Sequence, residues 1–245
     1  EVELLKKEGN LDLEIADRII ENVIGTMAYP FAVAVNFLIN GRDYMIPMVL
    51  EEPSVVAAAS NAARLMRRDG GIKTSSTGPV MIGQVQVVGV DDPYYRSQLI
   101  LDEREEILKI ANEKDPVLVN LGGGAKDLEV RVVESPIGSM VVVHLIVDVR
   151  DAMGANAVNT MCEAIAPTIE RITGGKVYLR IVSNLADKRL VRARVKVHKE
   201  DIGGEEVVDG IVAAWALAAA DPYRAATHNK GICLLYTSPS PRDRG

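Results

Sequence analysis

Hydrophobic and polar positions along the chain follow two periods, one typical of strands and one typical of helices. Residues 140–149 are nearly all branched and apolar, which is typical of a strand buried on both faces of a sheet. Residues 152–172 then place apolar side chains at helical spacing, and Pro167 is expected to bend or end this helix early because it has no amide donor. The apolar positions of the helix are Val158, Met161, Cys162, Ile165, Ile169 and Ile172.

The turn between this strand and this helix has the features of an anion site. Asp151 stands where a helix N-cap is expected, and Gly154 removes a side chain where a ligand could pass close to the backbone. The first N–H groups of a helix have no partner inside the helix and lie at the positive end of its dipole. An aspartate that only caps the helix is the alternative interpretation. The stretch does not carry the GxGxxG fingerprint, so the dinucleotide fold that uses it is not predicted.

The middle of the chain alternates strands and helices in a recognisable order. A polar, glycine-rich stretch at residues 69–77 precedes it and is interpreted as a hinge between domains. The predicted elements are a strand at 80–90, a helix at 95–111, strands at 127–134 and 140–149, a helix at 152–172 and a strand at 176–182. This is the β-α-β-β-α-β order of a ferredoxin-like domain, here predicted to span residues 78–183.

The flanking segments predict a second, larger and discontinuous domain at residues 1–77 and 184–233. Its elements are a helix at 11–22, a hairpin of strands 31–39 and 43–49 around Asn40–Gly41, an alanine-rich helix at 55–66, a half-buried strand at 191–197 and an apolar helix at 205–220. Residues Asp221, Pro222 and Tyr223 are expected to break the last helix. The fold class is therefore α+β. Residues 234–245 do not continue the pattern and are interpreted as a non-native tail.

Composition excludes several classes of protein. With 245 residues, 48% hydrophobic and 25% charged, the chain can bury a sizeable core. RNA-binding modules share the β-α-β-β-α-β order, but the net charge of −6 and the lack of aromatic residues in strands 80–90 and 140–149 argue against nucleic acid. The apolar runs are too short to span a bilayer. Two cysteines give neither a disulfide framework nor a metal site, which favours the cytoplasm.

Four segments, spread over most of the chain, resemble one enzyme family. They are ENVIG at residues 21–25, EEPSVVAAAS at 51–60, DVRDAMGAN at 148–156 and DPYRAATHNKGI at 221–232. Together they resemble 3-hydroxy-3-methylglutaryl-coenzyme A (HMG-CoA) reductases, most closely the class II enzymes of bacteria and archaea. The resemblance implies a large substrate domain with an inserted ferredoxin-like nucleotide domain. It also implies a homodimer or higher oligomer with a shared active site.

The implied reaction interconverts HMG-CoA with mevalonate and coenzyme A in two hydride transfers. Each reduction places negative charge on a carbonyl oxygen, and Lys230 matches the family's cation for that oxygen. Glu52 matches the catalytic glutamate; if buried near Lys230, it could stay protonated and donate a proton. Without the motif, Lys230 would be read as an ordinary surface lysine.

The resemblance also implies residues that hold the substrate and the cofactor. Ser54, Arg224 and Asn184 match positions of the substrate site, where an arginine suits the carboxylate of the hydroxymethylglutaryl group. The residues that match the nucleotide site are Asp115, Asp151, Met153, Gly154 and Asn156. An acid at Asp115 would accept from the ribose 2′-hydroxyl and repel a 2′-phosphate, so NAD is expected over NADP. Residues 116–125 contain no arginine or lysine that could bind a 2′-phosphate, which also favours NAD. The alternative interpretation is that Asp115 only starts a turn before Pro116.

Two family features have no match, and one charged strand stays open to interpretation. The family's later catalytic aspartate and its flap histidine have no counterpart, and His144, His198 and His228 do not replace them. A fragment or oligomer subunit that binds nucleotide without turnover is therefore the alternative function. Arg192, Arg194 and Lys196 form a basic face that is either simply solvated or a contact for a coenzyme A phosphate. No metal ion is expected.

Overall fold

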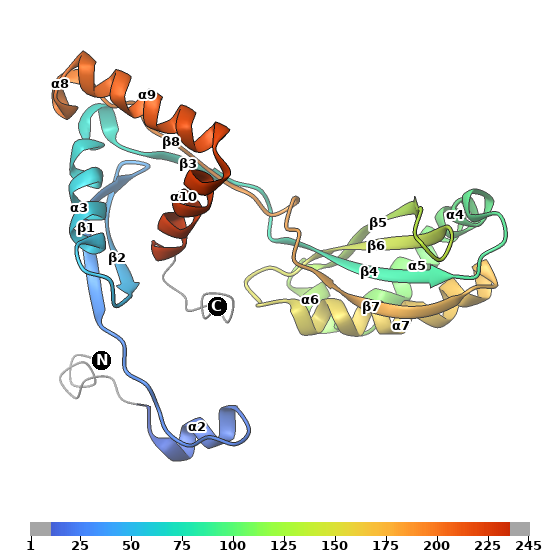
Figure 1. Cartoon of the computed structure of the whole chain (residues 1–245). Coiled ribbons are helices and arrows are strands. Elements are labelled where there is room, and N and C mark those ends of the chain that lie inside the picture. The colour runs from blue at the N-terminus through green and yellow to red at the C-terminus, as the bar shows by residue number, and fades with distance from the viewer. Residues whose placement is uncertain (1–10, 236–245) are drawn as a thin grey trace. The chain divides into compact units, whose positions relative to one another are not determined.

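The structure is a computed structural model that describes residues 11–235, and it divides into two compact units (Figure 1). The first unit comprises Glu1–Thr74 and Ala193–Gly245, and the second comprises Ser75–Arg192. The sequence placed the divisions after residues 77 and 183. Both unit boundaries fall inside a two-stranded sheet made by β3 (Lys73–Ser76) and β8 (Val191–Arg194), which form the two connections between the units.

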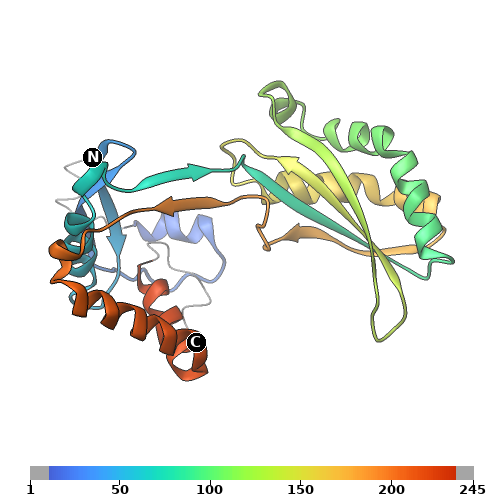
Figure 2. The ribbon, with the colours of Figure 1, turned by 90° about the horizontal axis from the view of Figure 1, so that it is seen from above.

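The second unit is built on one four-stranded antiparallel sheet in the order β5-β6-β4-β7. Its strands are β4 (Val80–Val88), β5 (Gly124–Val133), β6 (Met140–Asp148) and β7 (Lys176–Ser183). Figure 2 shows β5 and β6 joined as a hairpin. The four strands follow the order expected from the sequence, and the chain as a whole is a mixed α+β protein.

One face of this sheet carries the core of the second unit. Val85 pairs with Val143 and Val87 with Val141 across β4 and β6, and all four side chains are fully buried. The helix α7 (Ala155–Thr173) runs along the sheet (Figure 1) and adds Ile165, Ile169 and other apolar residues to the same cluster. The buried strand and amphipathic helix predicted from the periodicity are therefore confirmed.

The start and the middle of α7 differ from the prediction. The helix begins at Ala155 with Gly154 as its N-cap, so Asp151 lies three positions before the cap and does not cap the helix. Gly154 has φ +91°, a conformation that favours glycine, and this sharp turn starts the helix later than expected. Pro167 lies inside the helix, which continues to Thr173. The apolar residues beyond the proline, Ile169 and Ile172, are buried, and their burial outweighs the missing hydrogen bond.

The crossover from β4 to β5 contains three helices where one was expected. They are α4 (Pro93–Asp102), α5 (Arg104–Asn112) and α6 (Pro116–Asn120). Glu103 separates α4 from α5, and its carboxylate is bound by Arg171 of α7 at 2.6 Å. This tertiary contact is invisible to helical periodicity, as was the short helix α6.

The first unit contains the predicted hairpin and a set of helices. Its elements are α2 (Leu13–Ile19), β1 (Phe31–Ile39), β2 (Arg42–Val49), α3 (Val55–Leu65), the 3₁₀ turn η1 (Arg68–Gly70), α8 (Lys199–Ile202), α9 (Glu205–Ala220) and α10 (Pro222–Leu234). Asn40 and Gly41 have φ values of +50° and +80°, as a two-residue hairpin turn with positive φ at both positions requires. The hairpin prediction is confirmed.

Two predictions for the end of the chain need correction, namely the half-buried strand and the tail that starts at residue 234. The strand β8 stops at Arg194 and all four of its residues are exposed, so it is not half-buried. The helix α9 has the predicted bounds, yet none of its residues is buried. The break at Asp221 does occur, but it also caps the unpredicted helix α10, which reaches Leu234 in the expected tail; residues 236–245 of that tail lie outside the described residues. Within the described part of the chain, no helix is both long and apolar enough to cross a membrane.

A close contact between Gly83 and Cys162 fixes the distance between β4 and α7. A Cβ atom built on Gly83 would lie 2.2 Å from the Cys162 Sγ and 2.8 Å from the Val158 Cγ1. Cys162 is fully buried. Any side chain at position 83 would therefore push the helix away from the sheet.

We expect Gly83→Ala to lower the free energy of unfolding by about 1–3 kcal/mol, the usual cost of overpacking a core. Combining it with Cys162→Ala should recover much of this loss, because the sulfur is the nearest obstacle. Denaturant unfolding of the single and double variants measures the coupling. Gly78→Ala, whose Cβ would meet its nearest neighbour at 3.8 Å, is the matched control. Purely additive effects would show that the two residues do not limit the packing.

The two cysteines should react very differently with thiol reagents. Burial raises the pKa of the Cys162 thiol to about 12, whereas Cys233 is exposed on α10. The thiolate is the reactive species, so Cys162 is protected both by its protonation and by its burial. A colorimetric thiol assay at pH 8 should count one fast thiol in the native chain and two in denaturant. Two fast thiols in the native chain would mean that α7 is not packed on the sheet.

Candidate functional site

Lys230 and Glu52 form the central pair of the candidate site in the first unit. The Lys230 Nζ donates to the Glu52 Oε2 at 2.8 Å, although the residues stand 178 positions apart in the sequence. Lys230 lies on α10, and Glu52 lies in the turn between β2 and α3. The folding of the first unit therefore joins two of the four motifs.

Helix capping sets the position of Lys230. The Asp221 carboxylate accepts from the Arg224 backbone N–H at 2.8 Å, and Pro222 occupies the first turn of α10. An aspartate cap followed by proline is a strong start signal for a helix. It fixes where α10 begins and therefore which turn carries Lys230.

The turn that carries Glu52 ends at a residue with unusual backbone geometry. Ser54 is the N-cap of α3 but has φ +70°, and its side chain makes no capping hydrogen bond. Left-handed backbone at a non-glycine residue is strained. The Ser54 hydroxyl is therefore not used by the helix beside which it lies, and it is exposed.

Glu52 lies beside Lys230, but it does not meet the other condition for proton donation, which is burial. Its side chain is 43% exposed and that of Lys230 is 63% exposed. An exposed ion pair of this kind stabilises a fold by at most about 1 kcal/mol.

The other substrate-site residues are placed less closely. Arg224 is exposed on α10, and its guanidinium makes no hydrogen bond to the described residues. It lies six positions before Lys230, which corresponds to about 9 Å along the helix and about 120° around it. The two cations thus point in different directions. Asn184 follows β7, is exposed and belongs to the second unit, so the structure does not group it with Glu52 and Lys230.

Most of the predicted nucleotide residues lie at one edge of the second unit's sheet. Asp148, at the end of β6, pairs with Val80 at the start of β4 and with Gly124 at the start of β5. The turn from Asp148 to Gly154 and the N-terminus of α7 follow at the same edge. Asp151, Met153 and Asn156 are exposed there, whereas Gly154 is buried.

The N-terminus of α7 fits an anion. No side chain caps this helix, whereas aspartate side chains cap α4, α6 and α10. A Cβ atom on Gly154 would lie 2.5 Å from the Met81 Sδ and 2.9 Å from the Val149 Cβ, so only glycine allows this close approach of turn and strand. The uncapped first turn leaves backbone N–H groups free to donate to a phosphate.

Asp115 is the N-cap of helix α6. Its Oδ1 accepts from the Leu118 backbone N–H at 2.9 Å and caps α6, directly before Pro116. Asp115 therefore has the local structural role that the alternative interpretation gave it, as the start of a helix. A capping carboxylate keeps a second oxygen for a ligand, so the cap does not exclude contact with a ribose.

Sequence reasoning missed Arg150. Its guanidinium donates to the Gly122 carbonyl oxygen and lies 3.6 Å from the Asp148 carboxylate. A cation therefore reaches the loop at residues 116–125, which contains no basic residue of its own. Its position in the motif VRDAMG was the available signal, but the contact depends on the pairing of β5 with β6.

The three histidines lie in three different environments. His144 is buried in β6, where desolvation lowers its pKa, and its Nε2 lies 2.9 Å from the Gln84 Nε2. The His198 Nε2 contacts the Asp69 Oδ2 at 2.5 Å. His228 is exposed on α10.

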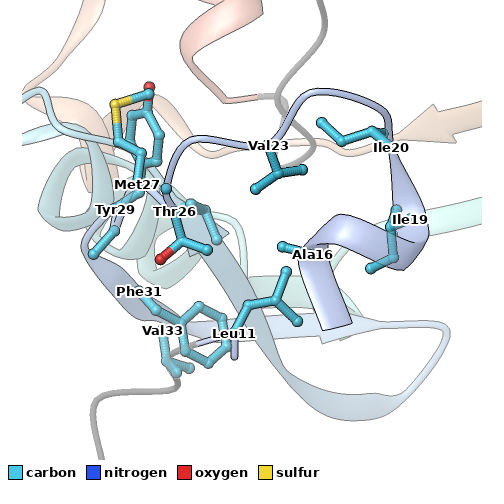
Figure 3. Close-up of a pocket in the computed structure, with 13 residues that line it drawn as sticks. Leu11, Ala16, Ile19, Ile20, Val23, Thr26, Met27, Tyr29, Phe31 and Val33 are labelled. Atoms are coloured by element: carbon cyan, nitrogen blue, oxygen red, sulfur yellow. The ribbon is translucent and has the colours of Figure 1, made fainter. Parts of the chain in front are cut away.

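A cavity of about 910 Å³ opens in the first unit between α2 and β1 (Figure 3). Most of the side chains that line it are apolar, and Val23 and Gly25 of the ENVIG motif contribute to it. The remaining lining residues are Leu11, Ala16, Ile19, Ile20, Thr26, Met27, Ala28, Tyr29, Phe31, Val33 and Val49. Neither Glu52 nor Lys230 lines this cavity, so it offers no acid–base chemistry of its own.

Known proteins resemble this chain along nearly its full length. It is 62% identical over 232 residues to the 3-hydroxy-3-methylglutaryl-coenzyme A reductase of Archaeoglobus fulgidus, which covers 95% of this chain and 53% of that protein. A probable reductase of Borreliella burgdorferi is 30% identical over 91% of this chain and 52% of that protein. The chain thus spans about half the length of these relatives.

Solved structures show the same likeness. The class II reductase of Streptococcus pneumoniae, bound to NADPH in open conformations, matches with a TM-score of 0.91 and 39% identity over 95% of this chain and 64% of that chain. A further structure of the reductase from that organism matches with a TM-score of 0.91 and 40% identity over the same shares. The sequence profile of hydroxymethylglutaryl-coenzyme A reductase matches residues 1–237, so the chain belongs to the hydroxymethylglutaryl-coenzyme A reductase family.

Proposed function

We propose that this chain carries part of the active site of an HMG-CoA reductase. Lys230 and Glu52 of the first unit would act on the substrate, and the second unit would bind the nucleotide. The proposed reaction reduces the thioester of HMG-CoA to mevalonate and coenzyme A, or runs in reverse. The observation that carries the proposal is the 2.8 Å contact between Lys230 and Glu52, the two residues that match the family's catalytic positions. Residues so distant in sequence meet at a site that neither a capping nor a core role explains.

Lys230 is proposed to stabilise the negative charge that forms on the substrate's carbonyl oxygen. A preorganised cation at a developing oxyanion is usually the largest single catalytic contribution. The ammonium can also donate a proton to that oxygen as it becomes an alcohol. The exposed position of Lys230 leaves it accessible to a bound substrate.

Glu52 is proposed to orient Lys230 and to take part in proton transfer. Its Oε2 accepts from the Lys230 ammonium, which fixes the direction of one N–H bond. Donation of a proton by Glu52 would need the pair to lose solvent when substrate binds, because burial favours the neutral carboxyl form. Ser54, Arg224 and Asn184 are proposed to bind the substrate, with the Arg224 fork on its carboxylate.

The second unit is proposed to be a ferredoxin-like domain that binds a nicotinamide dinucleotide, the group that supplies the hydride. Its element order and the strand order β5-β6-β4-β7 support this assignment. The uncapped start of α7, with Gly154 and Asn156, would hold a phosphate, while Asp151 and Met153 lie exposed beside it. Asp115 would face the adenosine ribose.

Two observations favour different forms of the cofactor. The structure of the Streptococcus pneumoniae reductase contains NADPH, which supports NADP for the family member described here. The carboxylate of Asp115 favours NAD, because it would repel a 2′-phosphate. The expectation of NAD therefore depends on Asp115 alone. The titration described below distinguishes a preference for NAD from a preference for NADP.

An oligomer with a shared active site and a cytoplasmic location complete the proposal. The exposed apolar residues of α9, which include Ile211, Val212, Trp215 and Leu217, support burial of this helix against further protein. The two unpaired cysteines, one of them exposed, support a reducing compartment.

We expect Lys230→Ala to lower turnover by a factor of at least about 10²–10³, the usual effect of removing one oxyanion donor. The activity assay uses residues 1–233 continued by the C-terminal part of the Archaeoglobus fulgidus relative, whose length this chain covers by 53%. The loss should appear mainly in kcat, because the oxyanion exists only as the hydride arrives. Nucleotide binding, measured by fluorescence, should stay nearly unchanged.

Arg224→Ala is the contrasting variant for that experiment. Its carboxylate partner is present before and during the reaction, so the loss should appear mainly as a higher KM for HMG-CoA. If Lys230→Ala keeps more than about a tenth of the activity, the oxyanion role belongs to another residue. Binding of nucleotide by an unmodified protein that never turns over would favour the non-catalytic alternative.

We expect Asp115→Asn to shift the cofactor preference toward NADPH by about tenfold, which corresponds to about 1.4 kcal/mol. Asparagine keeps an oxygen for the cap of α6 and removes only the charge that would repel a 2′-phosphate. Titration with NADH and NADPH measures the ratio of the two dissociation constants.

Asp92→Asn provides the control for this titration. Asp92 caps α4 through the Tyr95 N–H at 3.1 Å, so it makes the same kind of contact on another helix of the same unit. It should leave the ratio unchanged. An equal effect of both variants, or none for Asp115→Asn, would assign Asp115 a purely structural role.

A further inference from the structure

Arg150 connects two segments of the proposed nucleotide site. Its backbone N–H donates to the Asp148 Oδ1 at 3.0 Å, and its guanidinium lies 3.6 Å from the same carboxylate group. The guanidinium also donates to the carbonyl oxygen of Gly122, 28 positions earlier. Arg150 thus ties the turn after β6 to the loop before β5.

The backbone of Arg150 indicates that this arrangement is imposed. Arg150 has φ +51°, in the left-handed region that L-amino acids other than asparagine, aspartate and glycine rarely adopt. Such a conformation persists only where surrounding contacts determine it. The contacts available here are those with Asp148 and Gly122.

Backbone hydrogen bonds join the loop that Arg150 holds to α6. The N–H groups of Gly122 and Gly123 donate to the carbonyl oxygens of Val119 and Leu118, each at 2.9 Å. The same helix is capped by Asp115 at its other end. A Cβ atom on Gly123 would lie 2.7 Å from the Asp148 carbonyl oxygen, so the loop packs directly on the end of β6.

Asn112 fastens the far end of this loop and leaves the near end to Arg150. The Asn112 side chain donates to the Ala125 carbonyl oxygen at 3.0 Å and accepts from the Ala125 N–H at 2.8 Å. Gly122, at the other end, is exposed and receives the guanidinium. Arg150 therefore joins the exposed end of the loop to the turn that leads into α7.

We propose that Arg150 is a positioning residue of the nucleotide site, which fixes Asp115 and α6 relative to the N-terminus of α7. The inference rests on the proposed binding of a nicotinamide dinucleotide. A dinucleotide has a fixed length between its ribose and its phosphates, so the two segments must be held at a matching distance. The Arg150 guanidinium donates to the Gly122 carbonyl oxygen and lies 3.6 Å from the Asp148 carboxylate, so Arg150 acts through the loop.

The positioning role makes a different prediction from direct phosphate binding. A guanidinium that touched the 2′-phosphate would strengthen NADPH binding and leave NADH binding unchanged. A residue that positions the loop serves both cofactors equally. The comparison of the two cofactors therefore separates the roles.

The experiment uses the chain as it stands with Arg150→Ala, Arg150→Lys and the control Arg180→Ala. Arg180 of β7 forms an ion pair with Glu163 of α7 at 2.5 Å, away from the edge of the sheet where Arg150 lies. Hydrogen–deuterium exchange without cofactor follows residues 118–124, and fluorescence titration gives the dissociation constants for NADH and NADPH. Arg150→Ala should speed exchange in this segment and weaken both cofactors about tenfold. Arg150→Lys, which can still donate to Gly122, should recover part of both effects.

Each result has a definite meaning. Unchanged exchange at residues 118–124 in Arg150→Ala would overturn the inference, because the loop would then be held without the guanidinium. A loss confined to NADPH would also overturn it, in favour of direct contact. If the unmodified chain binds neither cofactor, the proposed nucleotide function fails, and the inference fails with it even where exchange shows that Arg150 holds the loop. Effects of similar size in Arg180→Ala would attribute the changes to the loss of any ion pair.

Discussion

The burial of β6 on both faces is the constraint on which the second unit depends. Nearly every side chain of this strand is buried, and it pairs with β4 on one side and β5 on the other. Burial of branched apolar side chains stabilises the unit by about 1.5–3 kcal/mol for each residue. In the observed register the strand ends at Asp148, opposite Val80 and Gly124, and this end is the edge where the turn, α7 and β5 meet. The candidate nucleotide residues inherit their positions from this register.

The first unit depends on different physics. Its candidate pair, Lys230 and Glu52, is exposed, and its helix α9 has no buried residue in spite of an apolar sequence. Position is set by local signals, such as the Asp221 cap and the Asn40–Gly41 turn, more than by a large core. A local signal fixes where an element begins but says little about what it finally contacts. The pairing of Lys230 with Glu52 is therefore a tertiary result that these signals permit without imposing.

The parts of the fold that the sequence predicted are those in which one local force dominates. The hairpin depends on positive φ at two adjacent residues, and the central strands depend on continuous apolar burial. The wrong predictions lie where two forces compete. At Pro167 the packing of Ile169 and Ile172 overrides a missing hydrogen bond, and at Gly154 a tight turn against Met81 overrides an aspartate that looked like a cap. Periodicity carries no information on which of two competing terms is larger.

The candidate site divides in the same way. The motifs gave the residue types, but the exposure of Glu52, the capping role of Asp115 and the contact of Arg150 follow from neighbours that are remote in sequence. An exposed ion pair stabilises a fold by at most about 1 kcal/mol, so stability alone gives no reason to align a lysine and a glutamate at this point. The two charges would attract each other, and a charge on a bound ligand, more strongly if that ligand displaced water, because charges interact more strongly at low dielectric. Under the proposed function, this behaviour suits a step in which negative charge on the substrate's oxygen exists only briefly.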